Sequence, residues 1–136
     1  MSARLDGKVA LVTGGTGGIG RETALGLARL GATVVVVGRD AARGEAAVEA
    51  IRRESGNDDV RLMTADLSSL DEVRGLAARF AAAHDRLDIL VNNAAGMYAE
   101  RGETADGFER TLAMTHLSPA LLTHLLLPLL RASVPA

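Results

Sequence analysis

The stretch Leu11–Ala24, "LVTGGTGGIGRETA", decides the fold. It completes an apolar run over residues 9–13, passes through a cluster of glycines and enters an amphipathic pattern from about Ile19 to Leu30. A Gly-rich turn between a strand and a helix lets the backbone approach a pyrophosphate. The free N–H groups and the dipole at the helix N-terminus favour the negative charge. The stretch therefore predicts a dinucleotide-binding loop centred on Gly14, Gly18 and Gly20.

Two other interpretations of this loop fit less well. A P-loop carries Lys and then Ser or Thr after its last glycine, whereas Gly20 is followed by Arg21 and Glu22. A purely structural glycine turn accounts for the glycines but not for the strand before them and the helix after them. The context therefore favours nucleotide binding.

The rest of the chain continues the alternation of strand and helix. Expected strands cover 33–38, 60–64 and "LDILVNN" at 87–93. Expected helices run from a cap at Asp40 to about Ser55, from a cap at Ser69 to about His84, and from near Thr104 and Asp106 to about Arg131 through two prolines. Short connections imply right-handed parallel crossovers. We therefore expect one α/β domain over residues 1–136, a Rossmann-type three-layer fold with a parallel sheet in the order 3-2-1-4 and helices on both faces.

Composition excludes several classes of function. The formal charge is −2 and aromatic residues make up 2% of the 136 residues, so neither a basic field nor stacking platforms for nucleic acid are present. The chain has no Cys, and its three His residues lack metal-ligand spacing, so we expect no metal. No segment reads as a signal peptide or a membrane span, which predicts a cytoplasmic protein without a membrane partner.

The end of the second predicted strand discriminates between cofactors. Folds that bind NAD usually place an acidic residue there to bind the ribose 2′-OH, whereas this chain has Gly38 followed by Arg39. A small residue leaves room for a 2′-phosphate, and Arg can meet it with a charge-assisted contact. NADP is therefore the expected cofactor, with NAD possible. The alternative is a solvent-facing Arg39 neutralised by Asp40.

Three motifs resemble the short-chain dehydrogenase/reductase family. "TGGTGGIG" matches its cofactor loop, "ADL" with Asp66 its adenine-contacting segment, and "NNAAG" its segment after the fourth strand. Two longer stretches, "GRDAARGEAAVEAIRRE" and "TADGFERTLAMTHLSPALLTHLLLPLL", are most similar to the branch that contains retinol dehydrogenases. The spacing of Gly14, Gly17 and Gly20 also suits extended and atypical members, but "NNAAG" favours the common short form.

The resemblance implies a set of cofactor-binding residues. They come from the glycine loop, the end of the second strand, the "ADL" segment and the "NNAAG" segment. The set is Thr13, Gly14, Thr16, Gly18, Ile19, Gly20, Arg39, Asp66, Leu67, Asn93 and Ala94.

The resemblance also implies hydride transfer between NADP(H) and a carbonyl or alcohol, with Tyr as general acid/base, Lys four positions later, Ser and Asn. Here Tyr98 is the only Tyr, position 102 is Gly, and the only Lys is Lys8. Thr115 stands where the Asn aligns, and Ala95 where the family has Gly. The Ser would come from a fifth strand beyond Ala136, and Ser133 is expected in a frayed tail. The chain is therefore expected to be the cofactor-binding half of a family member, truncated before strand five, with no catalytic residue of its own.

The expected partners follow from the sheet edge. Residues 89–91 would leave an unpaired strand edge, and Leu122, Leu125, Leu126 and Leu129 form an apolar stripe. A homo-oligomer, a complementing chain or marginal stability is therefore expected. Two alternatives to an oxidoreductase stay open: a non-catalytic nucleotide-binding module, and a truncated remnant that acts through oligomerisation. The carboxylate pairs Asp58 with Asp59 and Asp85 with Asp88 are expected to cap helices or to face water.

Overall fold

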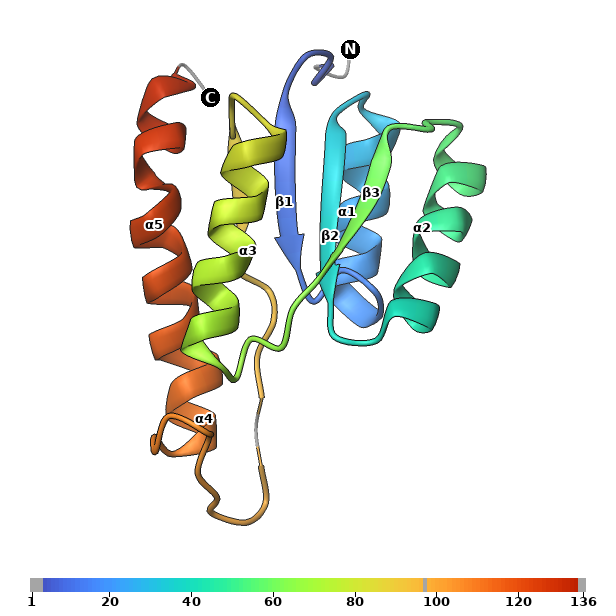
Figure 1. Ribbon diagram of the computed structural model, residues 1–136. Coiled ribbons are helices and arrows are strands. Elements are labelled where there is room, and N and C mark those ends of the chain that lie inside the picture. The colour runs from blue at the N-terminus through green and yellow to red at the C-terminus, as the bar shows by residue number, and fades with distance from the viewer. Residues whose placement is uncertain (1–3, 97, 135–136) are drawn as a thin grey trace.

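The computed structural model describes residues 4–96 and 98–134 and consists of one parallel sheet between two layers of helices (Figure 1). The strands lie in the order β3-β2-β1-β4, and every pairing between neighbours is parallel. This confirms the predicted class and strand order. The strands are β1 (Val9–Thr13), β2 (Thr33–Gly38), β3 (Val60–Thr64) and β4 (Ile89–Val91).

The helices cover the sheet in two pairs, because the central strands are apolar on both faces. Along β2, Val34 and Val36 pack toward one pair, while Val35 and Val37 pack toward the other. All four are fully buried. One layer holds α1 (Gly18–Arg29) and α2 (Ala41–Ser55); the other holds α3 (Leu70–Ala83) and α5 (Ser118–Ala132).

Strand β4 is shorter than predicted, and side chains take part in the hydrogen bonding to β1 at both of its ends. Before it, the Asp88 carboxylate accepts from Val9 N at 2.8 Å. After it, Asn93 N donates to the Thr13 hydroxyl at 3.1 Å instead of continuing the ladder. Three residues are therefore left to pair with β1, and all three are half-buried.

The last helical region begins later than predicted. Asp106 does not start it: its Oδ2 accepts from Leu70 N at 2.9 Å, so this side chain serves the N-terminus of α3. The region begins with α4 (Arg110–Leu112), whose cap is the Glu109 carboxylate. A π-helical turn (Ala113–Leu117) then leads without a break into α5.

This helical run contradicts one exclusion drawn from the sequence. Residues Arg110–Ala132 are helical over 23 residues, long and apolar enough by length and composition to cross a membrane. The expectation that no stretch meets that criterion was wrong, since Pro119 lies in the first turn of α5 and Pro128 leaves the helix intact. In this fold α5 packs along α3 and contributes Leu122 and Leu126 to the core.

The amino end of the sheet carries a buried polar network that the sequence did not predict. The Asp88 side chain is fully buried and takes two hydrogen bonds from Arg86, one from Val9 N and an ion pair from Lys8 at 3.8 Å. Ser133 accepts from Leu87 N at 2.9 Å. The expectations that Asp88 caps a helix or faces water, and that Ser133 lies in a frayed tail, were therefore wrong.

Candidate functional site

The glycine loop lies at the carboxyl end of β1, where it turns into α1 (Figure 1). Gly14 has φ +65°, and a Cβ there would lie 2.9 Å from Asn93 Nδ2. A Cβ on Gly20 would overlap the carbonyl oxygen of Gly14. Only glycine fits at these two positions. The loop therefore lies close to the end of β4, and its backbone carries no side chain there.

The N-terminus of α1 lacks the side-chain cap that other helices have. Gly17 occupies the N-cap position, no side chain among the described residues caps the first turn, and no acidic residue lies in that turn. By contrast, α2 is capped by Asp40 and α3 by Ser69. The first N–H groups of a helix have no intrahelical partner, so the start of α1 offers unmatched donors to an anion.

The end of β4 braces the loop from behind. The Thr13 hydroxyl accepts from the backbone N–H groups of Asn93 and Ala94, and the Asn93 amide donates to the carbonyl oxygens of Thr13 and Gly14. Thr13 is 2% exposed. These contacts place Thr13 and Asn93 where they hold the loop's shape instead of lining the open pocket.

A cavity of about 730 Å³ opens in front of the loop. It lies at the carboxyl edge of the sheet, where ligands of parallel α/β folds bind. The structure thus brings together residues that follow the ends of all four described strands. Of the residues assigned to the cofactor from sequence, its lining includes Gly14, Thr16, Arg39, Asp66, Leu67 and Ala94.

Two arginines face this cavity from the start of α2. Arg39 was expected there; Arg43 was missed by the sequence reasoning, although it follows at the helical spacing of four residues. Arg43 Nη2 lies 2.8 Å from the place that a Cβ on Gly17 would take. Neither arginine forms an ion pair within the described residues. Asp40 instead accepts from the backbone N–H of Arg43 at 3.0 Å.

Gly38 is kept small by a neighbour on the glycine loop. A Cβ at this position would lie 2.5 Å from Thr16 Cγ2 and 3.2 Å from Thr16 Oγ1. An acidic side chain at the end of β2, the usual partner of a ribose 2′-OH, cannot be accommodated unless Thr16 moves. The part of the cavity next to Gly38 is thus bordered by the Thr16 hydroxyl and by the Arg39 and Arg43 side chains.

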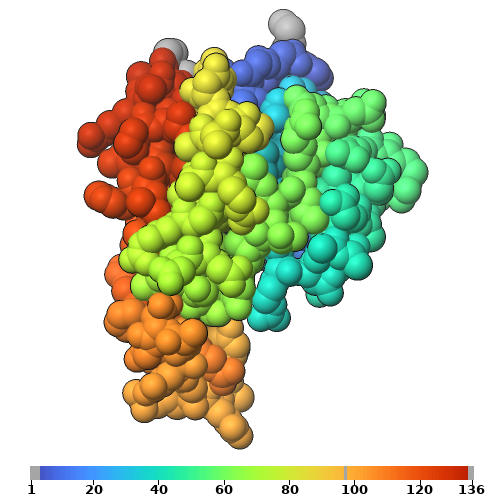
Figure 2. All heavy atoms as spheres, viewed as in Figure 1, coloured from blue at the N-terminus to red at the C-terminus, as the bar shows by residue number. Residues whose placement is uncertain are grey.

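The outer wall of the cavity comes from the segment between β4 and α4, which projects beyond the sheet (Figures 1 and 2). Arg110 Cζ lies 4.3 Å from the centroid of the Tyr98 ring, a cation–π contact. Arg110 also donates from Nη2 to the carbonyl of Glu100 at 3.3 Å. No motif in the sequence marks either side chain as part of this pocket.

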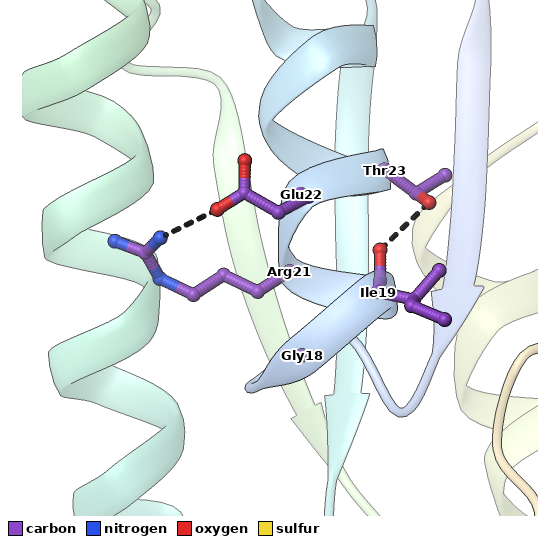
Figure 3. Close-up of a pocket in the computed structure, with 5 residues that line it drawn as sticks. All are labelled: Gly18, Ile19, Arg21, Glu22 and Thr23. Atoms are coloured by element: carbon purple, nitrogen blue, oxygen red, sulfur yellow. Dashed lines mark hydrogen bonds and ion pairs between the residues drawn. The ribbon is translucent and has the colours of Figure 1, made fainter.

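A second, more open hollow lies at the N-terminus of α1 (Figure 3). It is lined by Gly18 and Ile19, both assigned to the cofactor from sequence, and by three residues of the following turn. The Ile19 side chain is 80% exposed, which is unusual for a large apolar residue at the start of a packed helix. The close-up shows Thr23 bonded to the Ile19 carbonyl and Arg21 paired with Glu22.

The single Tyr and the single Lys lie at opposite ends of the sheet. Tyr98 lines the cavity at the carboxyl edge, whereas Lys8 pairs with Asp88 at the amino edge. Thr115 lies in the π-helical turn, and its hydroxyl donates a hydrogen bond to the Thr111 carbonyl oxygen at 2.5 Å. These residues do not come together as a proton relay.

Comparison with known proteins identifies relatives over almost the whole chain. A family model described as short chain dehydrogenase matches residues 8–134. Polyprenol dehydrogenase of Mus musculus is 54% identical over 93% of this chain and 38% of its own length. Retinol dehydrogenase 12 of Homo sapiens is 44% identical over 99% of this chain and 43% of its own length. The chain thus spans about two fifths of the length of these curated relatives.

Solved structures agree in fold. A structure described as a Pseudomonas aeruginosa RhlG/NADP active-site complex superposes with a TM-score of 0.81 at 38% identity, over 98% of this chain and 50% of that one. A short chain dehydrogenase from Escherichia coli CFT073, complexed with NADPH, gives 0.78 at 30% identity, over 96% of this chain and 56% of that one.

Proposed function

The chain belongs to the short-chain dehydrogenase family, and from that premise we propose that it binds NADP(H) in the cavity at the carboxyl edge of the sheet. The observation that carries the proposal is the N-terminus of α1, which within the described residues has no side-chain cap and lies beside Arg39 and Arg43, neither of them in an ion pair there. The pyrophosphate would accept from the backbone N–H groups of the glycine loop, and no side chain of residues 4–96 or 98–134 caps the first turn of α1.

The preference for NADP over NAD rests on the region around Gly38. Thr16 fills the place that an acidic side chain would need, and Arg39 and Arg43 face the same cavity. Both features favour a 2′-phosphate over a 2′-hydroxyl, since an arginine meets phosphate with charge-assisted hydrogen bonds. Asp66 and Leu67 would then border the adenine, and Ala94 its ribose.

Titration with NADPH and NADH tests this proposal. The chain has no Trp, so the emission of the reduced nicotinamide is followed directly. We expect saturable binding of both cofactors, with NADPH bound about tenfold or more tightly. Equal affinities would remove the basis for the NADP preference, and the absence of any saturable change would contradict the proposal as a whole.

We further propose that the reaction served by this site is the family's hydride transfer between NADP(H) and a carbonyl or alcohol. The bound nicotinamide supplies or accepts the hydride, and this chain's residues hold and orient the cofactor. Because Tyr98 and Lys8 are far apart in the fold, we expect the 136-residue chain alone to show no turnover with alcohols or ketones. Steady turnover by the purified chain would contradict this expectation, and turnover that survives Tyr98→Phe would show that a residue other than Tyr98 acts as the acid/base.

The last part of the proposal is that another chain packs against the side of the molecule formed by β4 and α5. Within residues 4–96 and 98–134, β4 pairs with β1 alone, and Leu125 on α5 is 38% exposed. We expect the chain to self-associate or to bind a complementing chain through this side. A monodisperse monomer at micromolar concentration, with a concentration-independent thermal transition, would contradict it.

A further inference from the structure

The turn between β3 and α3 is held by hydrogen bonds from several directions. The backbone N–H of Asp66 donates to Glu72 Oε1 at 2.9 Å, and Ser69 N donates to the Asp66 carbonyl at 3.1 Å. Leu70 N donates to Asp106 Oδ2 at 2.9 Å. Partners on α3 and on the projecting segment therefore fix the backbone of this turn where it meets the cavity.

The Asp66 carboxylate is engaged on one oxygen only. Oδ1 accepts from the backbone N–H of Ser68 at 3.0 Å and from the Ser68 hydroxyl at 2.6 Å. Within the described residues no donor reaches Oδ2. Both Asp66 and Ser68 line the cavity. Since an ionised carboxylate only accepts hydrogen bonds, Oδ2 is an acceptor left to a ligand.

We propose that Ser68 is a positioning residue that makes Asp66 selective for the amino group of adenine. This inference rests on the proposed binding of NADP(H). The final torsion of an Asp side chain is broad, and the two bonds to Oδ1 restrict it. Oδ2 then faces the base in one orientation instead of many.

The chemistry of this contact selects between purines. The exocyclic amino group of adenine donates hydrogen bonds, which an acceptor-only carboxylate oxygen can take. Hypoxanthine carries a carbonyl oxygen at the same ring position, and that oxygen would face the carboxylate as a second acceptor. The fixed carboxylate should therefore favour the adenine cofactor over its deaminated analogue.

Ser69 provides a matched control one residue away. Its hydroxyl accepts from Glu72 N at 3.3 Å and caps α3, with no bond to the Asp66 carboxylate. Ser68→Ala and Ser69→Ala therefore remove the same group from the same turn. Only the first releases Asp66, and Ser68→Thr keeps the hydroxyl as the conservative variant.

The experiment measures dissociation constants for NADPH and for its hypoxanthine analogue, deamino-NADPH, with the unsubstituted chain and the three variants. We expect the unsubstituted chain to bind NADPH about tenfold or more tightly than the analogue. Ser68→Ala should reduce that ratio at least about threefold by weakening NADPH binding alone. Ser68→Thr should retain the ratio, and Ser69→Ala should shift both constants together.

Two outcomes separate this inference from the proposed function. If the unsubstituted chain binds neither cofactor, NADP(H) binding is wrong and the inference is overturned with it. If it binds NADPH but the ratio is unchanged in Ser68→Ala, or falls equally in Ser69→Ala, only the positioning role is overturned. Circular dichroism of each variant shows that the compared proteins are folded.

Discussion

The two ends of the sheet treat their polar groups in opposite ways. At the amino end, the buried Asp88 carboxylate is matched by backbone and side-chain donors, and the Ser133 hydroxyl both accepts and donates. At the carboxyl end, the first turn of α1 has no cap, and Arg39 faces a cavity without an ion pair in the described part of the chain. Matched groups stabilise a fold, whereas unmatched groups at an open cavity are available to a ligand. We therefore call the amino end of the sheet the structural end and the carboxyl end the binding end.

The largest expected effect is the loss of binding in Gly14→Val. The side chain would strain a residue at φ +65° and collide with Asn93, which keeps the backbone from the pyrophosphate. We expect affinity for NADPH and NADH to fall alike, by about a hundredfold or more, as measured by nicotinamide emission.

Gly26→Ala, on the same helix, is the control for that variant. A Cβ at Gly26 meets nothing within 4 Å, so cofactor affinity should be unchanged and the free energy of unfolding should rise slightly. A loss confined to one cofactor in Gly14→Val would show that Gly14 does not face the pyrophosphate that both cofactors share.

Asp88→Ala should show the reverse pattern at the amino end. Removing the carboxylate leaves the buried N–H of Val9 without a partner, and we expect the free energy of unfolding to fall by about 2 to 3 kcal/mol in urea titrations. Cofactor affinity below the unfolding transition should not change. Asp85→Ala, exposed in the same turn, should cost less than about 0.5 kcal/mol. Equal losses in the two variants would mean that burial of Asp88 does not matter.

Arg39→Asp sharpens the assignment of the binding end. The loss of a charge-assisted contact worth about 1.5 to 3 kcal/mol should abolish or reverse the preference for NADPH over NADH. The measurement is the ratio of the two dissociation constants. Arg53→Asp makes the same charge change in the last turn of α2 and should leave that ratio as it is. If both variants change it equally, net charge rather than contact sets the preference.

The smallest effect is a dependence of stability on acid. The Arg86 guanidinium and Val9 N–H hold the pKa of Asp88 below its ordinary value, against the opposing effect of burial. Because the folded pKa is depressed, this contribution to stability is complete above the unfolded value of about 3.9 and is lost as pH falls through the folded one. Urea titrations from pH 7 down to about 2.5 should show a decline below about pH 4 that is shallower in Asp88→Ala. An unchanged slope would argue against the ion pair.

The local pattern of the sequence predicts most of the fold. The first three strands begin and end at the predicted residues, because each is an apolar or β-branched run bounded by turn residues. Predictions failed where a residue distant in the sequence forms a hydrogen bond. The Thr13 hydroxyl accepts from Asn93 N where β4 was expected to continue, and the Asp106 carboxylate accepts from Leu70 N instead of capping the last helix. Burial of Asp88 likewise depends on a strand far away in sequence, which no local pattern reveals.

The residues of the candidate site likewise fall into those that the sequence predicts and those that it does not. Arg39 and Asp66 follow strands whose carboxyl ends share one edge, so topology alone places them at one cavity. Arg43, Ser68 and Tyr98 reach it through their side-chain conformations, which a sequence pattern does not define. The spacing of four residues from Arg39 could have drawn attention to Arg43, and the positions of Ser68 and Tyr98 in the segments that border the cavity could have drawn attention to them.

The bond between Val9 and Asp88 has a consequence for the order of folding during synthesis. It joins residues that are 79 apart in the chain. By contrast, β1 pairs with β2 and β2 pairs with β3, and each of these strands pairs with the next one along the chain. Closing the longer loop carries the greater entropic cost. A nascent chain can therefore assemble one side of its central strand first, and the other side of β1 stays open until residue 88 and the following strand have left the ribosome.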